Sequence, residues 1–414
     1  MPFYTQYLPN NRRSEIELLV CCARNFLDQE HTELIQNIAQ KDIDWDYLIQ
    51  VSYRHRVLPL LYRNLKNARL NGVTDQIIKK LKNFYLSNAI RNFYLTSELL
   101  KVLELIEGQN IFAVPFKGPI LAESLYGGIA LRQFYDLDIL VRVQDIIKVR
   151  SLLLANGYRD RIDLDDQQFI KFARTNTQDA FIRHDGIVNI ELHWEMSNKY
   201  ISMDYDFQQL RGRFETVTLQ GKKVRNLIAD DLLFYLCIHG TRHLWENLEM
   251  ICCVAELIRS HPQIDWNWVN FLATNMRCER ILFLGLFLAH DLYGTNLPSQ
   301  IAKKIADDSM ISRIATEIYQ ELFREDEISY EMSTKFHKLF FHIKVRNRLS
   351  EKIRFCLDEL IRPKEMDWIV CHLPASLSFL HYVIRPVRLV FKWIIEISKM
   401  QKNKYNNLCN LRGQ

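Results

Sequence analysis

Two aspartates in an apolar segment are the first residues whose type and spacing indicate chemistry. The segment FYDLDILV contains Asp136 and Asp138, separated by Leu137. Residues i and i+2 of a strand lie on the same face, so a strand here would place both carboxylates side by side. Adjacent carboxylates repel each other unless a cation lies between them, and Mg²⁺ prefers such oxygen ligands. The spacing predicts a divalent-metal site, although an isolated pair of this kind is also common on ordinary surface strands.

A second segment offers a third carboxylate. VNIELHW alternates between an apolar face and a polar face, and the polar face consists of Asn189, Glu191 and His193. If this strand lies beside the first, three carboxylates can hold two metal ions for in-line phosphoryl or nucleotidyl transfer. The alternative for Glu191 is a solvated position on the outer face. His193 either approaches a nucleotide or accepts a proton, or it has a structural role.

Basic residues flank these acids in the sequence. FKGP reads as a strand that runs into a helix at Lys117-Gly118. Backbone N–H groups at a helix N-terminus bind phosphate, and glycine permits close approach. Lys117 adds a positive charge there, and Arg132 is able to clamp a triphosphate with its two-pronged guanidinium. The alternative is an ordinary strand–helix turn.

His239 and His243 are four residues apart on a predicted helix. Two such histidines can share a metal ion, but the HExxH glutamate is missing and no third ligand stands out. A role on the substrate side and plain helix packing are the other two interpretations.

These residues need elements that bring them together. Glycine and proline are sparse, at 13 and 10 of 414 residues, and helical periodicity dominates 12–100 and the chain from 230 onward. Strands are predicted at 111–116 and 135–141, in a hairpin of 178–184 with 187–194, and in a pair at 215–219 and 223–227. Three Asp-Trp pairs, beginning at Asp44, Asp265 and Asp367, predict helix N-caps.

The predicted fold class is therefore α+β. We expect an N-terminal helical region (1–104), an α+β core (105–228), a C-terminal helical region (229–400) and a polar tail (401–414).

Composition excludes several classes of protein. Hydrophobic residues make up 48% and the formal net charge is +5. Global disorder and collagen-like chains are excluded, and the charge is too weak to argue for nucleic-acid binding. The nine cysteines include two adjacent pairs but no CxxC, which favours buried thiols in a reducing compartment. Without a visible signal peptide or an apolar run long enough to span a bilayer, we expect a cytoplasmic protein.

The order of these motifs resembles a known family. The chain is similar to the uncharacterised nucleotidyltransferase family of the polymerase-β-like superfamily in the order of its motifs. They are a strand, a Lys-Gly turn, a helix, LYGG, an arginine, DLDILV and IELHW. Further segments resemble the helical parts of this family. They are RHRVLPLLYRNL (54–65), Arg91-Asn92, HGTRHLWENL (239–248), DWNWV (265–269) and a late segment at 373–389.

The resemblance implies a small mixed β-sheet with flanking helices and metal-dependent transfer of a nucleotidyl group. Asp136, Asp138 and Glu191 would bind Mg²⁺, with Mn²⁺ as the alternative. Lys117 and Gly118 stand where the superfamily usually has a Gly-Ser turn. Arg132, His193, His239 and His243 are the further expected nucleotide-site residues.

Three functions follow from this resemblance. The first is transfer of an NMP group from an NTP, expected to be ATP, to a hydroxyl of a small molecule or peptide. The second is the same transfer to a protein. The third is a catalytically silent nucleotide-binding module.

Overall fold

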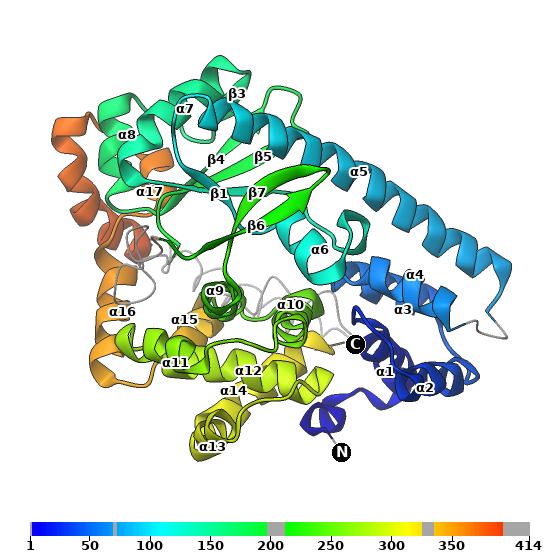
Figure 1. Ribbon diagram of the computed structural model, residues 1–414. Helices are drawn as coiled ribbons and strands as arrows, with labels where there is room; N and C mark the ends of the chain where they lie inside the picture. Colours follow the sequence, from blue (N-terminus) through cyan, green and yellow to red (C-terminus); the bar gives the residue numbers. More distant parts are fainter. Residues whose placement is uncertain (1, 69–72, 197–211, 325–334, 392–414) are drawn as a thin grey trace, which may run out of the picture.

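The computed structural model describes residues 2–68, 73–196, 212–324 and 335–391 (Figure 1). Helices surround one five-stranded sheet and one separate hairpin. The predicted α+β class, with a small mixed sheet between helical regions, is confirmed. Among the described residues, no helix combines the length and the apolar character that crossing a membrane requires.

The five-stranded sheet has the order β1-β2-β5-β4-β3. β2 runs parallel to β5, while the pairs β1–β2, β5–β4 and β4–β3 are antiparallel. A second sheet pairs β6 with β7. The strands are β1 (Ala113–Pro115), β2 (Leu137–Val141), β3 (Tyr158–Asp160), β4 (Gln178–Arg183), β5 (Asn189–His193), β6 (Phe214–Leu219) and β7 (Lys222–Leu227).

Helices before the sheet form the N-terminal part of the chain. The longest, α5, begins after Thr74, whose side chain accepts a hydrogen bond from the backbone N–H of Ile77, and it runs diagonally above the sheet in Figure 1. These helices are α1 (Arg13–Cys22), α2 (Gln29–Ala39), α3 (Trp45–Arg54), α4 (Leu58–Asn67) and α5 (Asp75–Glu107), preceded by the short turns η1 (Phe3–Tyr7) and η2 (Asn10–Arg12).

Short helices connect the strands, and longer ones follow the sheet. The connecting elements are α6 (Pro119–Tyr126), η3 (Ile129–Leu131), η4 (Val143–Asp145), α7 (Ile146–Ala155) and α8 (Asp166–Ala173). The C-terminal elements are α9 (Ala229–Arg242), α10 (Leu248–Ser260), α11 (Trp266–Asn275), α12 (Glu279–Tyr293), α13 (Ser299–Asp307), α14 (Ser309–Leu322), α15 (Lys335–Lys344), α16 (Leu349–Ile361), α17 (Glu365–Val370) and η6 (Ala375–Leu380).

The two faces of the sheet belong to two hydrophobic cores. Leu137 and Ile139 of β2 pack with residues of α5, α7 and α8. Leu140 and Phe116 pack instead with α9, α10, α12 and the N-terminal helices. Because side chains alternate along a strand, Asp138 lies on the second face, between the sheet and the C-terminal helices.

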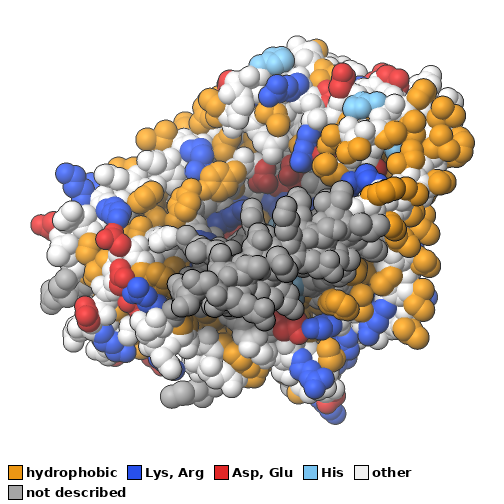
Figure 2. All heavy atoms as spheres, turned by 180° about the vertical axis from the view of Figure 1, so that it is seen from behind, with side chains coloured by type: hydrophobic (Ala, Val, Ile, Leu, Met, Phe, Trp, Pro, Cys, Tyr) orange, Lys and Arg blue, Asp and Glu red, His pale blue; other side chains and the backbone are white. Residues whose placement is uncertain are grey.

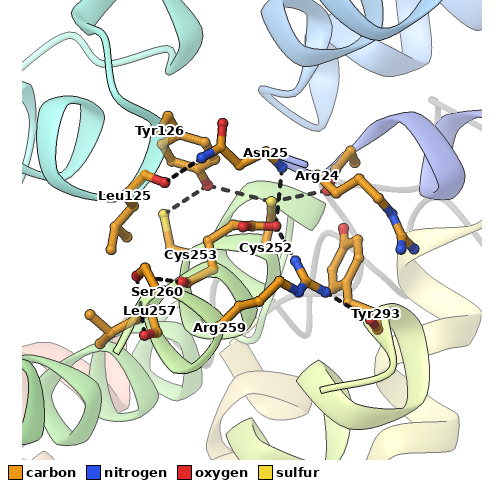
Figure 3. A network of polar contacts seen from close by, with 12 residues as sticks. Arg24, Asn25, Leu125, Tyr126, Cys252, Cys253, Leu257, Arg259, Ser260 and Tyr293 are labelled. Carbon is orange, nitrogen blue, oxygen red and sulfur yellow. Dashed lines mark hydrogen bonds and ion pairs between the residues drawn. The ribbon is translucent and has the colours of Figure 1, made fainter. Parts of the chain in front are cut away.

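A buried polar network ties α6 to α10 and to the end of α1 (Figure 3). The Asn25 amide donates to the carbonyl of Leu125, and the Asn25 backbone N–H donates to Glu256. The Cys252 thiol donates to the carbonyl of Ala23, and the Tyr126 hydroxyl lies 3.4 Å from the sulfur atoms of Cys252 and Cys253. This network fixes the helix that follows the Lys117-Gly118 turn.

Candidate active site

The parallel pairing of β2 with β5 brings the predicted acids together. The register places Asp138 directly opposite Glu191, and His193 lies two residues further along β5 on the same face. Ligand atoms of Asp138, Glu191 and His193 all lie within 4.8 Å of one another. On the other face, Val188, Ile190, Leu192 and Trp194 are buried as the alternation predicted. The sequence predicts a shared site only if the two strands lie side by side. The structure places them side by side.

Lys117 reaches into this cluster from the turn before α6. Its ammonium nitrogen lies 2.5 Å from Asp138 Oδ1, and both side chains are buried, at 10% and 1% exposure. His193 Nε2 lies 2.9 Å from the same oxygen. The second oxygen, Oδ2, is buried and has no hydrogen-bond partner among the described residues. Asp138 is therefore the centre of the cluster, with one oxygen neutralised and the other available.

Glu191 is held from its other side. The Gln178 side-chain amide donates to Glu191 Oε2 at 2.8 Å, and His193 Nε2 lies 3.6 Å from the same oxygen. Arg242 of α9 in turn donates to Gln178 Oε1, the side-chain amide oxygen, at 3.3 Å. A chain of contacts therefore runs from α9 through β4 to the carboxylate on β5.

Electrostatics keep the two central carboxylates ionised. Burial acts to raise the pKa of Asp138, but the Lys117 ammonium and the His193 hydrogen bond hold that pKa well below its ordinary value. Burial also opposes ionisation of Glu191, yet the neighbouring His193 imidazole and the charge of Lys117 leave its pKa lowered. At neutral pH both groups are therefore negative and able to serve as metal ligands.

Asp136 lies beside the cluster but outside β2, which begins at Leu137. Burial and the charge of Asp138 raise the pKa of Asp136. Gly118 approaches its backbone closely, because a Cβ atom on Gly118 would lie 3.2 Å from the Asp136 carbonyl oxygen. Gly118 has φ = 50° and ψ = −120°, a conformation that side-chain-bearing residues rarely adopt. The glycine thus allows the Lys117 turn to sit against the acidic loop.

The donor set fits a divalent cation. Two ionised carboxylates and an imidazole converge, and Asp138 Oδ2 is buried without a partner. Carboxylate oxygens suit Mg²⁺ and Mn²⁺, and the imidazole nitrogen suits Mn²⁺ better than Mg²⁺. Asp138, Glu191 and His193 are the residues that would hold such an ion.

Arg132, which the sequence analysis predicts to clamp a triphosphate, forms a buried ion pair in the structure. Its Nε donates to Glu249 Oε1 at 2.6 Å, with side-chain exposures of 11% and 6%. The same guanidinium donates to the Gly118 carbonyl at 3.4 Å, and the Cys253 thiol donates to Glu249. Arg132 therefore supports the Lys117-Gly118 turn, and its charge is already balanced by a buried partner.

His239 and His243 lie at the end of α9, close to the cluster. Their ring centres are 4.6 Å apart, and His239 also stacks on Tyr235. Burial lowers the pKa of His243 to about 3 and lowers that of His239 strongly, so both rings are neutral at pH 7. Within the described residues neither belongs to a three-ligand group.

A small cavity opens next to this cluster. Its lining residues come from the sheet and from α9, and they are Gln178, His193, Met196, Tyr235, Ile238, His239 and Arg242. Figure 2 shows the side of the molecule turned away from the viewer in Figure 1, where acidic and basic side chains gather around a hollow near the middle.

Gln178, Arg242 and Glu249 are site residues that the sequence did not single out. For Gln178 a signal existed. The Asp185-Gly186 turn fixes the β4–β5 register, in which Ala180 faces Glu191, so that Gln178 shares its face. For the other two residues no local pattern indicates the long-range contact.

One comparison with known proteins shows the family of this chain. The sequence pattern of the family described as uncharacterised nucleotidyltransferase matches residues 41–294, which leaves the late segment at 373–389 outside. No curated protein matches the chain significantly.

Three solved structures show low similarity to this chain. Lincosamide antibiotic adenylyltransferase LnuA, lincomycin-bound, is 15% identical over 39% of this chain and 94% of its own, with a TM-score of 0.29. ANT(2'')-Ia in complex with adenylyl-2''-tobramycin is 13% identical over 44% and 96%, with a TM-score of 0.32. An antigenic nucleotidyltransferase-like protein from Paracoccidioides brasiliensis is 14% identical over 51% and 95%, with a TM-score of 0.28.

Proposed function

Because the chain belongs to the uncharacterised nucleotidyltransferase family, we propose that it is an active, metal-dependent enzyme that transfers an NMP group from an NTP to an acceptor hydroxyl. The observation that carries this proposal is the convergence of Asp138, Glu191 and His193 on adjacent parallel strands. Two buried, ionised carboxylates beside an Asp138 oxygen that has no hydrogen-bond partner among the described residues support a site that binds a cation.

The proposed reaction is an in-line displacement at the α-phosphorus. The acceptor oxygen forms a bond to that phosphorus, the bond to the bridging oxygen breaks, and pyrophosphate leaves with the electron pair. The acceptor proton is released to solvent. Divalent ions, which we expect to be two, would supply charge stabilisation and activation of the hydroxyl.

The chain's own residues have distinct tasks in this proposal. Asp138, Glu191 and His193 would hold a divalent ion, and Asp136 beside them would be a further ligand. Lys117 balances the charge of Asp138 while the site is empty of substrate. Arg242 and Gln178 orient Glu191 through their hydrogen bonds.

The test uses labelled NTPs to show which phosphate group is transferred. Protein is incubated with cell extract, Mg²⁺ or Mn²⁺, and each of the four NTPs labelled at either the α- or the γ-phosphate. We expect label transfer from the α position alone, and its loss in Asp138→Asn. The matched control is Asp145→Asn, which lies outside the cluster and should remain active.

The fractionated products separate the alternatives. Label in the small-molecule fraction supports a small-molecule or peptide acceptor, and a labelled protein band supports a protein acceptor. Transfer of the γ label, or equal transfer by wild type and Asp138→Asn, would contradict the proposal. Nucleotide binding that needs no divalent ion and gives no turnover would identify a silent module.

A further inference from the structure

The position of Arg132 leaves an open question about the site. An NTP carries a multiply charged polyphosphate, and its binding needs cations that are not already neutralised. Arg132 is committed to Glu249, and Lys117 is committed to Asp138. Polyphosphate binding therefore needs further positive charges near the acidic cluster.

Two arginines from separate segments of the chain approach the residue directly before Asp136. The Arg91 guanidinium carbon lies 4.3 Å from the centre of the Tyr135 ring, and that of Arg56 lies 5.9 Å from it. Arg91 belongs to α5, and Arg56 belongs to the turn between α3 and α4. Both residues lie in segments, RHR and RN, that resemble the family but had no role assigned to them.

The described part of the chain offers neither guanidinium a neutralising carboxylate. Among the described residues, Arg56 and Arg91 form no ion pair with a carboxylate, and Arg91 Nε is buried without an acceptor. Within the described residues, the Arg91 side chain makes a single hydrogen bond, to the side-chain oxygen of Asn88. Two like charges brought to one ring repel each other unless an anion joins them, which is the same argument as for the paired carboxylates with the signs reversed.

The arrangement is held in place by the backbone. Arg56 has φ = 58°, which is uncommon for a residue with a side chain. The turn that contains it is anchored, because the carbonyl of the buried residue His55 accepts the backbone N–H of Glu249. Asn92, beside Arg91, donates to the carbonyls of Ile129 and Arg132 and so fixes the loop that leads to Tyr135. Strained or over-determined backbone of this kind is typical of ligand sites.

The patch is accessible and lies next to the acids. Tyr135 is 40% exposed and Tyr53, whose hydroxyl lies 3.4 Å from the Tyr135 hydroxyl, is 50% exposed. The charges of Arg56, Lys117 and Glu191 all act on the pKa of His243. Tyr135, which both guanidiniums approach, directly precedes Asp136, so the patch lies next to the acidic loop.

We propose that Arg56 and Arg91, presented on Tyr135, form the polyphosphate subsite of this enzyme. The inference rests on the proposed function for the identity of the ligand, but the subsite itself is defined by its affinity for polyphosphate. Guanidinium groups suit this task because they bind phosphate oxygens in a bidentate manner and are always charged. The subsite takes the place that Arg132 was expected to fill.

Calorimetric titration with inorganic tripolyphosphate in the presence of Mg²⁺ tests the proposal. We compare wild type with Arg56→Gln, Arg91→Gln and the control Arg54→Gln, which removes the same charge two residues away from an exposed position. Arg56→Gln should weaken tripolyphosphate binding about tenfold or more, whereas Arg54→Gln should change it less than about threefold. Adenosine affinity should be the same in all four proteins.

Arg91→Gln could disturb the Asn88 contact, so Arg56→Gln carries the decision and its melting temperature is measured in parallel. Equal weakening by Arg56→Gln and Arg54→Gln, or no tripolyphosphate binding by the wild type, would overturn the subsite. A loss of adenosine affinity instead would identify the patch as a base-binding surface and also overturn it. If the label-transfer experiment fails while the tripolyphosphate result holds, the subsite stands and the proposed activity falls.

Discussion

Replacing Arg132 separates two roles that the residue could have. As a triphosphate clamp, Arg132→Gln would raise KM for the NTP and leave the fold unaffected. The structure instead pairs it with Glu249 at 2.6 Å, with both side chains buried. Removal of one partner from a buried ion pair leaves the other charge uncompensated, which costs about 3–5 kcal/mol. We therefore expect Arg132→Gln to lower the free energy of unfolding by that amount.

Urea unfolding followed by circular dichroism measures this loss. The control is Lys80→Gln, which breaks the ion pair with Asp46, whose side chains are 48% and 86% exposed. Such surface pairs contribute about 0–1 kcal/mol. The double variant Arg132→Met/Glu249→Leu should recover most of the stability, because neither charge is then left buried alone. A loss below about 1 kcal/mol for Arg132→Gln, together with a raised KM, would refute this reasoning.

Two further predictions concern single residues. Burial raises the pKa of Asp179 from 3.8 to about 7, so the folded state holds a proton that the unfolded state has lost, and stability falls as the pH rises from about 4 to 7. Asp179→Asn should remove this fall and raise the free energy of unfolding by on the order of 4 kcal/mol at pH 8. Thermal unfolding at several pH values measures this, and parallel pH profiles of the two proteins would contradict it. Gly118→Ala places a Cβ 3.2 Å from the Asp136 carbonyl oxygen in a glycine-only conformation, which should cost about 1–3 kcal/mol and lower NTP turnover at least about tenfold. Unchanged kcat and stability in Gly118→Ala would show that the turn has room to move.

Local patterns predicted the elements well where one segment contains the whole signal. The region 12–100, predicted to be helical, contains α1 to α4 and most of α5, and both predicted hairpins formed. Asp44 and Asp265 cap α3 and α11 as predicted. Asp367 differs, because it lies inside α17, where it accepts the Lys364 N–H and binds Arg385.

Short elements and long-range partners were beyond local patterns. β3 and α8 were not predicted, since three strand residues and eight helical residues give too little periodicity. Strand alternation correctly placed Glu191 and His193 on one face, but only the fold could show that this face lies beside Asp138. Arg132 and Glu249 are 117 residues apart, and nothing in either segment indicates the other.

The central claim is that Asp138 and Glu191 meet on neighbouring strands to hold a divalent cation. Crystals soaked with Mn²⁺ test it directly through anomalous scattering. The account predicts a Mn²⁺ peak in contact with Asp138 Oδ2 and Glu191, and no peak there in Asp138→Asn crystals. A wild-type structure without an ion at these two carboxylates, at Mn²⁺ concentrations that support turnover, would contradict it.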